Sequence, residues 1–326
     1  MNGLKYFMIF LMIGFCFLNK QAISQEILFT KGPGSYRILG ENVDTIKIPF
    51  TMLKGKPVMQ VEINGEKGKL MIDNGVLWDQ VWLFGSPLVT KLNLKPIDEG
   101  SIEGSDEGEP TSFYTARNIT LKFDDIIFYD QPVLVSPPAA GFAKLFPGTD
   151  GQLCNTFFKH FIVELNFIAK QIVLYKPEQF HYTGNGSVLD MELNKSGTHS
   201  IPFKLEMSDG KIYDDRVDID FGGIYPLKIA LNNRHNIQLP VDVKRIHSTG
   251  AQGKNTEYSG KIKSLTFGKY TFNNPDVVFG DAKTSRIFPD NLGVIGLPLF
   301  MKFNIIFDYI SNKIYIDPNE NFDKPF

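Results

Sequence analysis

The chain of 326 residues carries 34 Lys and Arg against 36 Asp and Glu. This near balance gives no reason to expect a nucleic-acid partner, because such partners are bound by clustered basic residues. Phe (28) and Tyr (12) are abundant, and 29 Gly and 19 Pro separate short apolar runs, a composition that predicts an all-β protein.

Residues 1–24 have the features of an export signal. Lys5 precedes an apolar run of 13 residues, Tyr6–Leu18, which is too short to span a bilayer, and Ala22-Ile-Ser24 offers a small-residue cleavage site. We therefore expect an exported protein, periplasmic or secreted, without a stable membrane anchor. Cleavage would leave Cys154 as the only cysteine, so no intramolecular disulfide is expected.

Short runs that alternate apolar and polar residues predict strands along the rest of the chain. Val58–Ile63 alternates in this way and is followed by Asn64-Gly65, a typical hairpin turn. Helical periodicity is limited to residues 155–161 and 297–302. The predicted strands are 45–52, 57–64, 68–73, 119–129, 132–136, 162–166, 171–175, 200–207, 215–220, 226–230, 261–267, 270–272, 276–279, 303–308 and 313–316.

Two of these predicted strands run into an Asp-x-Gly turn, Asp73-Asn74-Gly75 and Asp220-Phe221-Gly222. Either turn alone is uninformative, because Asp is common beside Gly in surface turns. Together they allow a second interpretation, in which the two carboxylates face each other across a cleft. Such a pair cannot easily ionise twice, so it shares a proton and divides the roles of acid and base.

The two halves of the chain also resemble each other. Ile48-Pro-Phe50 corresponds to Ile201-Pro-Phe203, and Asp150–Phe167 corresponds to Leu292–Tyr309. A repeat of about 145 residues is too long for a solenoid and suits two homologous lobes, each supplying one Asp-x-Gly turn; two unrelated β domains are the alternative. The expected organisation is a signal peptide at 1–24, lobes at 25–176 and 200–326, and a linker at 177–199.

These turns and their spacing resemble the pepsin-like aspartyl proteases, in particular the bacterial secreted, retropepsin-related members. In that family each lobe has an Asp-Thr/Ser-Gly turn, with two apolar residues and a glycine packed behind it. Leu153-Cys154 and Val294-Ile295-Gly296 stand at these later positions here. The resemblance implies two β-barrel-like lobes with an active-site cleft between them, Asp73 and Asp220 as catalytic residues, and no cofactor.

The chain departs from the family pattern within the turns themselves. Asn74 and Phe221 replace the family's Thr or Ser, whose hydroxyl cross-links the two turns, and Cys154 replaces a supporting glycine. The amide of Asn74 can donate and accept hydrogen bonds, whereas the side chain of Phe221 can do neither. Two functions therefore stay open: an aspartic endopeptidase, or a catalytically impaired peptide-binding protein of the cell envelope on the same scaffold.

Other residues are candidates for substrate contact. Trp78, Trp82, Tyr114 and Tyr225 either line the cleft or pack in the core. The acidic segment 98–109 lies where the family has its flap, the hairpin that closes over substrate; the alternative is a solvated loop.

No pattern supports metal, nucleotide or serine-hydrolase chemistry. The five histidines, at 160, 181, 199, 235 and 247, lack ligand spacing. We expect a monomer that takes a peptide or protein substrate and needs neither metal nor cofactor.

Overall fold

The computed structural model describes residues 34–40, 43–75, 81–102, 109–137, 141–194, 197–249, 253–280 and 289–326, so the predicted export signal lies outside the described residues. The described residues form mainly strands, which confirms the all-β prediction. The first half contains β1 (Tyr36–Ile38), β2 (Thr45–Leu53), β3 (Lys56–Ile63), β4 (Glu66–Ile72), β5 (Val81–Leu83), α1 (Pro87–Leu92), β6 (Asp98–Ile102), β7 (Thr111–Phe123), β8 (Ile126–Val135), α2 (Gly141–Leu145), β9 (Gly151–Leu153), β10 (Ile162–Asn166) and β11 (Gln171–Tyr175).

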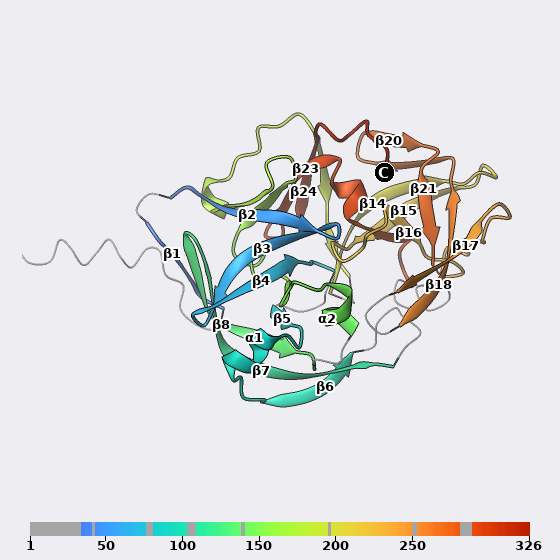
Figure 1. Cartoon of the computed structure of the whole chain (residues 1–326). Helices are drawn as coiled ribbons and strands as arrows, with labels where there is room; N and C mark the ends of the chain where they lie inside the picture. The colour runs from blue at the N-terminus through green and yellow to red at the C-terminus, as the bar shows by residue number, and fades with distance from the viewer. Residues whose placement is uncertain are drawn as a thin grey trace, which may run out of the picture.

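The second half continues in the same manner (Figure 1). It contains β12 (Ser187–Asp190), β13 (Glu192–Leu193), β14 (His199–Glu206), β15 (Ile212–Ile219), β16 (Leu227–Ile229), β17 (Lys244–Thr249), β18 (Lys254–Lys261), β19 (Ser264–Phe267), β20 (Tyr270–Asn273), β21 (Asp276–Phe279), β22 (Gly293–Ile295), α4 (Leu297–Phe300), β23 (Phe303–Asp308) and β24 (Lys313–Pro318).

Some sequence predictions need correction. The predicted strand 119–129 joins the end of β7 to the start of β8 through a turn at Asp124-Asp125. Residues 155–161 form consecutive turns instead of a helix, although Phe161 N–H still donates to the carbonyl of Phe157 (3.0 Å). The three-residue strands β5, β9 and β22 were not predicted, because they are buried on both faces and show no alternation.

The same strand order occurs in both halves. In the first, β4 pairs in parallel with β9, β9 pairs antiparallel with β5, and β5 pairs in parallel with β8. In the second, β15, β22, β16 and β21 repeat these pairings in the same order and directions. The repeat seen in the sequence therefore corresponds to a repeated sheet topology.

A shared sheet joins the two halves. Its strands run in the order β12-β24-β23-β10-β11-β2, with β10 antiparallel to β23. In Figure 1 the blue β2 and the red β23 and β24 accordingly lie on the same side of the molecule. Residues 177–199, expected as a linker, contribute β12 to this sheet and β13 to the edge of β14.

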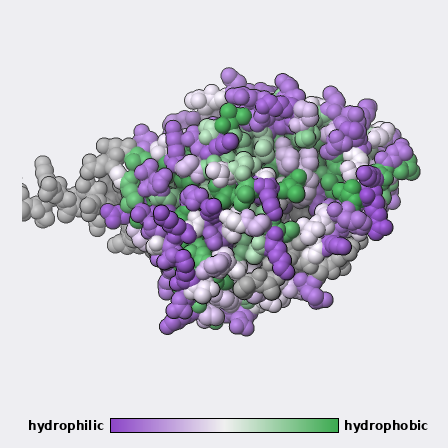
Figure 2. Space-filling view, in the orientation of Figure 1, coloured by the Kyte–Doolittle hydropathy of each residue, from purple (hydrophilic) through white to green (hydrophobic). Residues whose placement is uncertain are grey.

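The core is rich in phenylalanine, and Phe157, Phe221, Phe300 and Phe307 are all fully buried. On the face shown in Figure 2, hydrophilic residues dominate the outline, and hydrophobic residues show between them as separate spots. Among the described residues, no helix has the length and apolar character needed to cross a membrane.

Candidate active site

Each Asp-x-Gly turn begins where a central strand ends. Asp73 follows β4, and its N–H donates to the carbonyl of Leu153 in the parallel neighbour β9 (3.0 Å). Asp220 follows β15, and its N–H donates to the carbonyl of Ile295 in β22, also at 3.0 Å. The two late apolar elements therefore support the two turns in the same way.

The structure brings the two carboxylates together. Gly75 N–H donates to Oδ1 of Asp73 (3.0 Å), and Gly222 N–H donates to Oδ1 of Asp220 (2.5 Å). A Cβ placed on Gly222 would lie 2.6 Å from Oδ1 of Asp220 and 2.9 Å from Oδ2 of Asp73. These two oxygens are thus no farther apart than one water can bridge with two hydrogen bonds of about 2.8 Å.

Glycine is required at both turns because the opposite carboxylate approaches so closely. A Cβ on Gly75 would stand 2.2 Å from Oδ1 of Asp220, well inside contact distance. Gly296 is constrained in the same way by the backbone behind it, since its Cβ would stand 2.2 Å from the carbonyl oxygen of Tyr225. Cys154, at the equivalent place in the first half, is buried.

The electrostatic environment favours one proton on the pair. Burial, followed by the charge of Asp220, raises the pKa of Asp73 to about 7, against the opposing effects of Lys56 and of hydrogen bonds from Gly75 and Gly222. Two carboxylates this close cannot both ionise without mutual repulsion. The pair therefore retains a proton up to near-neutral pH.

Asn74 connects the two turns. Its Oδ1 accepts a hydrogen bond from the N–H of Phe221 (3.1 Å), and its Nδ2 donates to the hydroxyl of Tyr309 (3.1 Å). The ring of Tyr309 stacks on Phe158 and lies 3.8 Å from the ring of His199, centroid to centroid. The Asn74 amide thus supplies one hydrogen bond between the two turns, in place of a bond that the hydroxyl of the family's Thr or Ser makes.

Phe221 points away from the cleft. Its side chain is fully buried and makes edge contacts with Phe300 and Phe307, at centroid distances of 5.4 and 5.3 Å. Its bulk therefore does not crowd the meeting point of the turns, where only its backbone takes part.

Lys56 is a site residue that the sequence did not reveal. It begins β3, is 1% exposed, and its Nζ donates to the carbonyl of Phe221 (2.7 Å) and to that of Gly222. The two partners of the first bond lie 165 positions apart, so no local pattern pointed to the contact. The only available signal was a lysine on the same strand face as the buried Val58.

Tyr225, predicted to contact substrate, lies beside the pair. Its hydroxyl donates to Oδ2 of Asp220 (3.3 Å). Burial and then the charge of Asp220 raise the pKa of Tyr225 well above its usual value, so the phenol stays protonated. Beneath its ring, 4.5 Å from the centroid, is Nζ of Lys228, which forms a buried ion pair with Glu257 (2.5 Å).

The other residues predicted to contact substrate lie in different places in the structure. Trp78 lies outside the described residues. Trp82 is buried in β5 and donates to the hydroxyl of Ser136 (2.5 Å), so it belongs to the core. Tyr114, on β7, lines a groove of about 920 Å³ between α1 and the β6–β7 hairpin. Residues 98–102 of the acidic segment form strand β6, paired with β7, and 103–108 lie outside the described residues.

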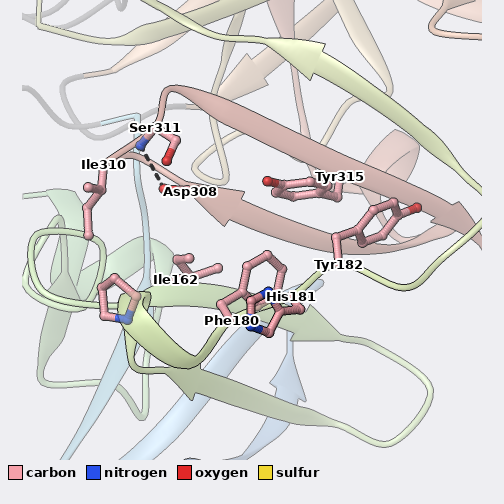
Figure 3. A pocket seen from close by; sticks show the side chains of 9 residues that line it. Ile162, Phe180, His181, Tyr182, Asp308, Ile310, Ser311 and Tyr315 are labelled. Carbon is pink, nitrogen blue, oxygen red and sulfur yellow. Dashed lines mark hydrogen bonds between the residues drawn. The ribbon is translucent and has the colours of Figure 1, made fainter.

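A second cavity, of about 320 Å³, lies against the shared sheet, and neither Asp73 nor Asp220 lines it. Figure 3 shows Asp308 and Tyr315 on one side and Phe180 and His181 on the other. The carboxylate of Asp308 accepts a hydrogen bond from the N–H of Ser311 (2.8 Å). Among the described residues, no cluster of three or more His, Cys, Asp or Glu is arranged to hold a metal ion.

Comparison with known proteins supports the fold. No protein-family model and no curated protein matches the sequence. Among solved structures, the aspartic proteinase from Irpex lacteus is similar, with a TM-score of 0.52 and 12% sequence identity over 86% of this chain and 99% of that one. The fold is therefore the two-lobed, pepsin-like fold that the sequence predicted.

Proposed function

We propose that the protein is an aspartic-type endopeptidase whose catalytic residues are Asp73 and Asp220. One observation carries the proposal: two carboxylates from equivalent turns meet within the span of one bridging water, each held by the N–H of the glycine two residues later. The pepsin-like fold supports it. Export to the periplasm or beyond remains part of the proposal.

The chemistry follows from a pair that carries one proton. The ionised carboxylate removes a proton from a water held between Asp73 and Asp220, and the water attacks the scissile carbonyl carbon. The protonated carboxylate donates its proton to the carbonyl oxygen, giving a tetrahedral diol. The protonated carboxyl then donates its proton to the leaving nitrogen while the other carboxylate takes a proton from a hydroxyl of the diol. The carbon–nitrogen bond breaks, a carboxylic acid and an amine leave, and the pair again carries one proton.

A peptide-binding protein without turnover is the second candidate. The observation that favours it is the lack of a hydroxyl side chain in either turn, at Asn74 and at Phe221. The structure weakens this argument, because Asn74 supplies an inter-turn hydrogen bond of ordinary length.

One experiment separates the candidates. The mature protein is incubated with a diverse peptide library across about pH 3 to 8, beside the Asp220→Asn variant, and products are identified by mass spectrometry. The endopeptidase proposal expects cleavage by the wild type that is lost in the variant. Peptide binding without cleavage by the wild type would favour the second candidate instead.

A further inference from the structure

Lys56 occupies a position that is unusual for a lysine. It is 1% exposed, although lysine is almost never fully buried unless it is paired. It begins β3 in the first lobe, and its ammonium reaches across to the Asp220 turn in the second. The ammonium also lies over the ring of Phe146, with Nζ 5.9 Å from the centroid.

We propose that Lys56 is a positioning residue of the aspartate pair, whose ammonium ties the second turn to the first lobe and sets the pH range in which the pair holds one proton. This inference rests on the proposed function for its catalytic meaning. Its physical content, an electrostatic effect on the pair, can be measured independently of turnover.

The first part of the argument is geometric. The backbone N–H of Phe221 is taken by Oδ1 of Asn74, while the carbonyls of Phe221 and Gly222 accept from Lys56. All three bonds come from the first lobe. Together they satisfy the N–H of Phe221 and the carbonyls of Phe221 and Gly222, for which the phenylalanine side chain has no hydrogen-bonding group. They also fix the position of Asp220 relative to Asp73.

The second part is electrostatic. Burial lowers the pKa of Lys56, and the charges of Asp73 and Asp220 raise it in opposition. The reciprocal effect is that Lys56 lowers the pKa of Asp73. The other groups near Asp220 are the Tyr225 hydroxyl, the Lys228–Glu257 ion pair beneath its ring, and the buried carboxyl of Asp218. Burial and, to a smaller extent, the charge of Asp220 raise the pKa of Asp218 to about 6. Lys228 is paired with Glu257, and among the described residues Lys56 is the cation that lowers the pKa of Asp73.

The test compares Lys56→Gln, which keeps a hydrogen-bond donor and removes the charge, with Lys56→Arg, which keeps the charge. Lys69→Gln is the matched control, because Lys69 is an exposed residue on the neighbouring strand β4. The carboxyl ¹³C resonances of Asp73 and Asp220 are titrated in each protein, with assignments from the single Asp→Asn variants. Where peptide cleavage is measurable, its pH profile is recorded as well.

The expected result is a rise of about one pH unit in the midpoints of the pair, and in the alkaline limb of activity, for Lys56→Gln. Lys56→Arg and the control should keep the wild-type midpoints. A purely structural lysine would give a lower rate in Lys56→Gln at every pH with unmoved midpoints, and that result overturns the proposal.

A measurement on the wild type covers the case in which the Lys56 variants do not fold. The ¹⁵Nζ resonance of Lys56 should shift with the same midpoint as the aspartate pair, and a flat response through that range overturns the proposal. If the wild type cleaves no peptide, the proposed function fails, while the carboxyl and Nζ titrations still decide the role of Lys56.

Discussion

Replacing Phe221 with threonine gives this chain the hydroxyl that its second turn lacks, yet the structure predicts damage and not repair. The side chain is fully buried and makes edge contacts with Phe300 and Phe307. Truncating a buried phenylalanine to alanine costs about 3–5 kcal/mol, and threonine restores little of that volume. The N–H that a new hydroxyl would bind is already bonded to Asn74. We expect a loss of about 3–4 kcal/mol in the free energy of unfolding and no gain in activity.

The assay is urea-induced unfolding followed by far-UV circular dichroism, with peptide cleavage measured in parallel. Phe221→Leu should lose about 1–2 kcal/mol, since leucine keeps most of the apolar volume. Phe326→Thr, at the half-exposed C-terminus, should lose less than about 1 kcal/mol. A Phe221→Thr variant as stable as the wild type and faster in cleavage would refute the view that this side chain is core.

Three further predictions follow from the site. Gly75→Ala should reduce cleavage by about 10²-fold or more while the protein still folds, because its Cβ would stand 2.2 Å from Oδ1 of Asp220 and displace that carboxylate; kcat/KM and circular dichroism together test this. Asn74→Ala leaves the buried N–H of Phe221 unpaired and should lower the free energy of unfolding in urea by about 1–3 kcal/mol. A variant as stable as the wild type would show that the Asn74–Phe221 hydrogen bond does not stabilise the protein. The pKa of Asp73 is raised from 3.8 to about 7, so the folded protein holds this proton more tightly than the unfolded chain. Its contribution to stability is therefore fully present below about pH 4 and lost as pH rises through about 7. Unfolding measured across this window should show the decline in the wild type and a flatter curve in Asp73→Asn.

The two aspartates were predictable because their signal is local and repeated. An apolar strand that ends in Asp-x-Gly is weak evidence by itself. Asp73 and Asp220 are, however, each followed by a similar apolar element, and in a duplicated fold each such element is expected to pack behind its Asp-x-Gly turn. The strand pairings of β9 with β4 and of β22 with β15 realise that prediction.

The residues that complete the site were not predictable in the same way. Lys56 and Tyr309 act across 165 and 235 positions, respectively, so their roles depend on how the lobes meet. The core position of Phe221 was not predictable, because the sequence shows the loss of a hydroxyl but not the direction of a side chain. Its backbone N–H, which every residue except proline possesses, makes the contact with Asn74.

The central claim is that Asp73 and Asp220 act as one proton-sharing unit. The measurement that tests it most directly is kcat/KM on a cleaved library peptide for the wild type, Asp73→Asn, Asp220→Asn and the double variant. Residues that act as a unit are strongly non-additive, so each single variant should lose about 10³-fold or more, and the double variant should lose little beyond that. A single variant within about ten-fold of the wild type, or a double loss equal to the product of the two single losses, would contradict the claim.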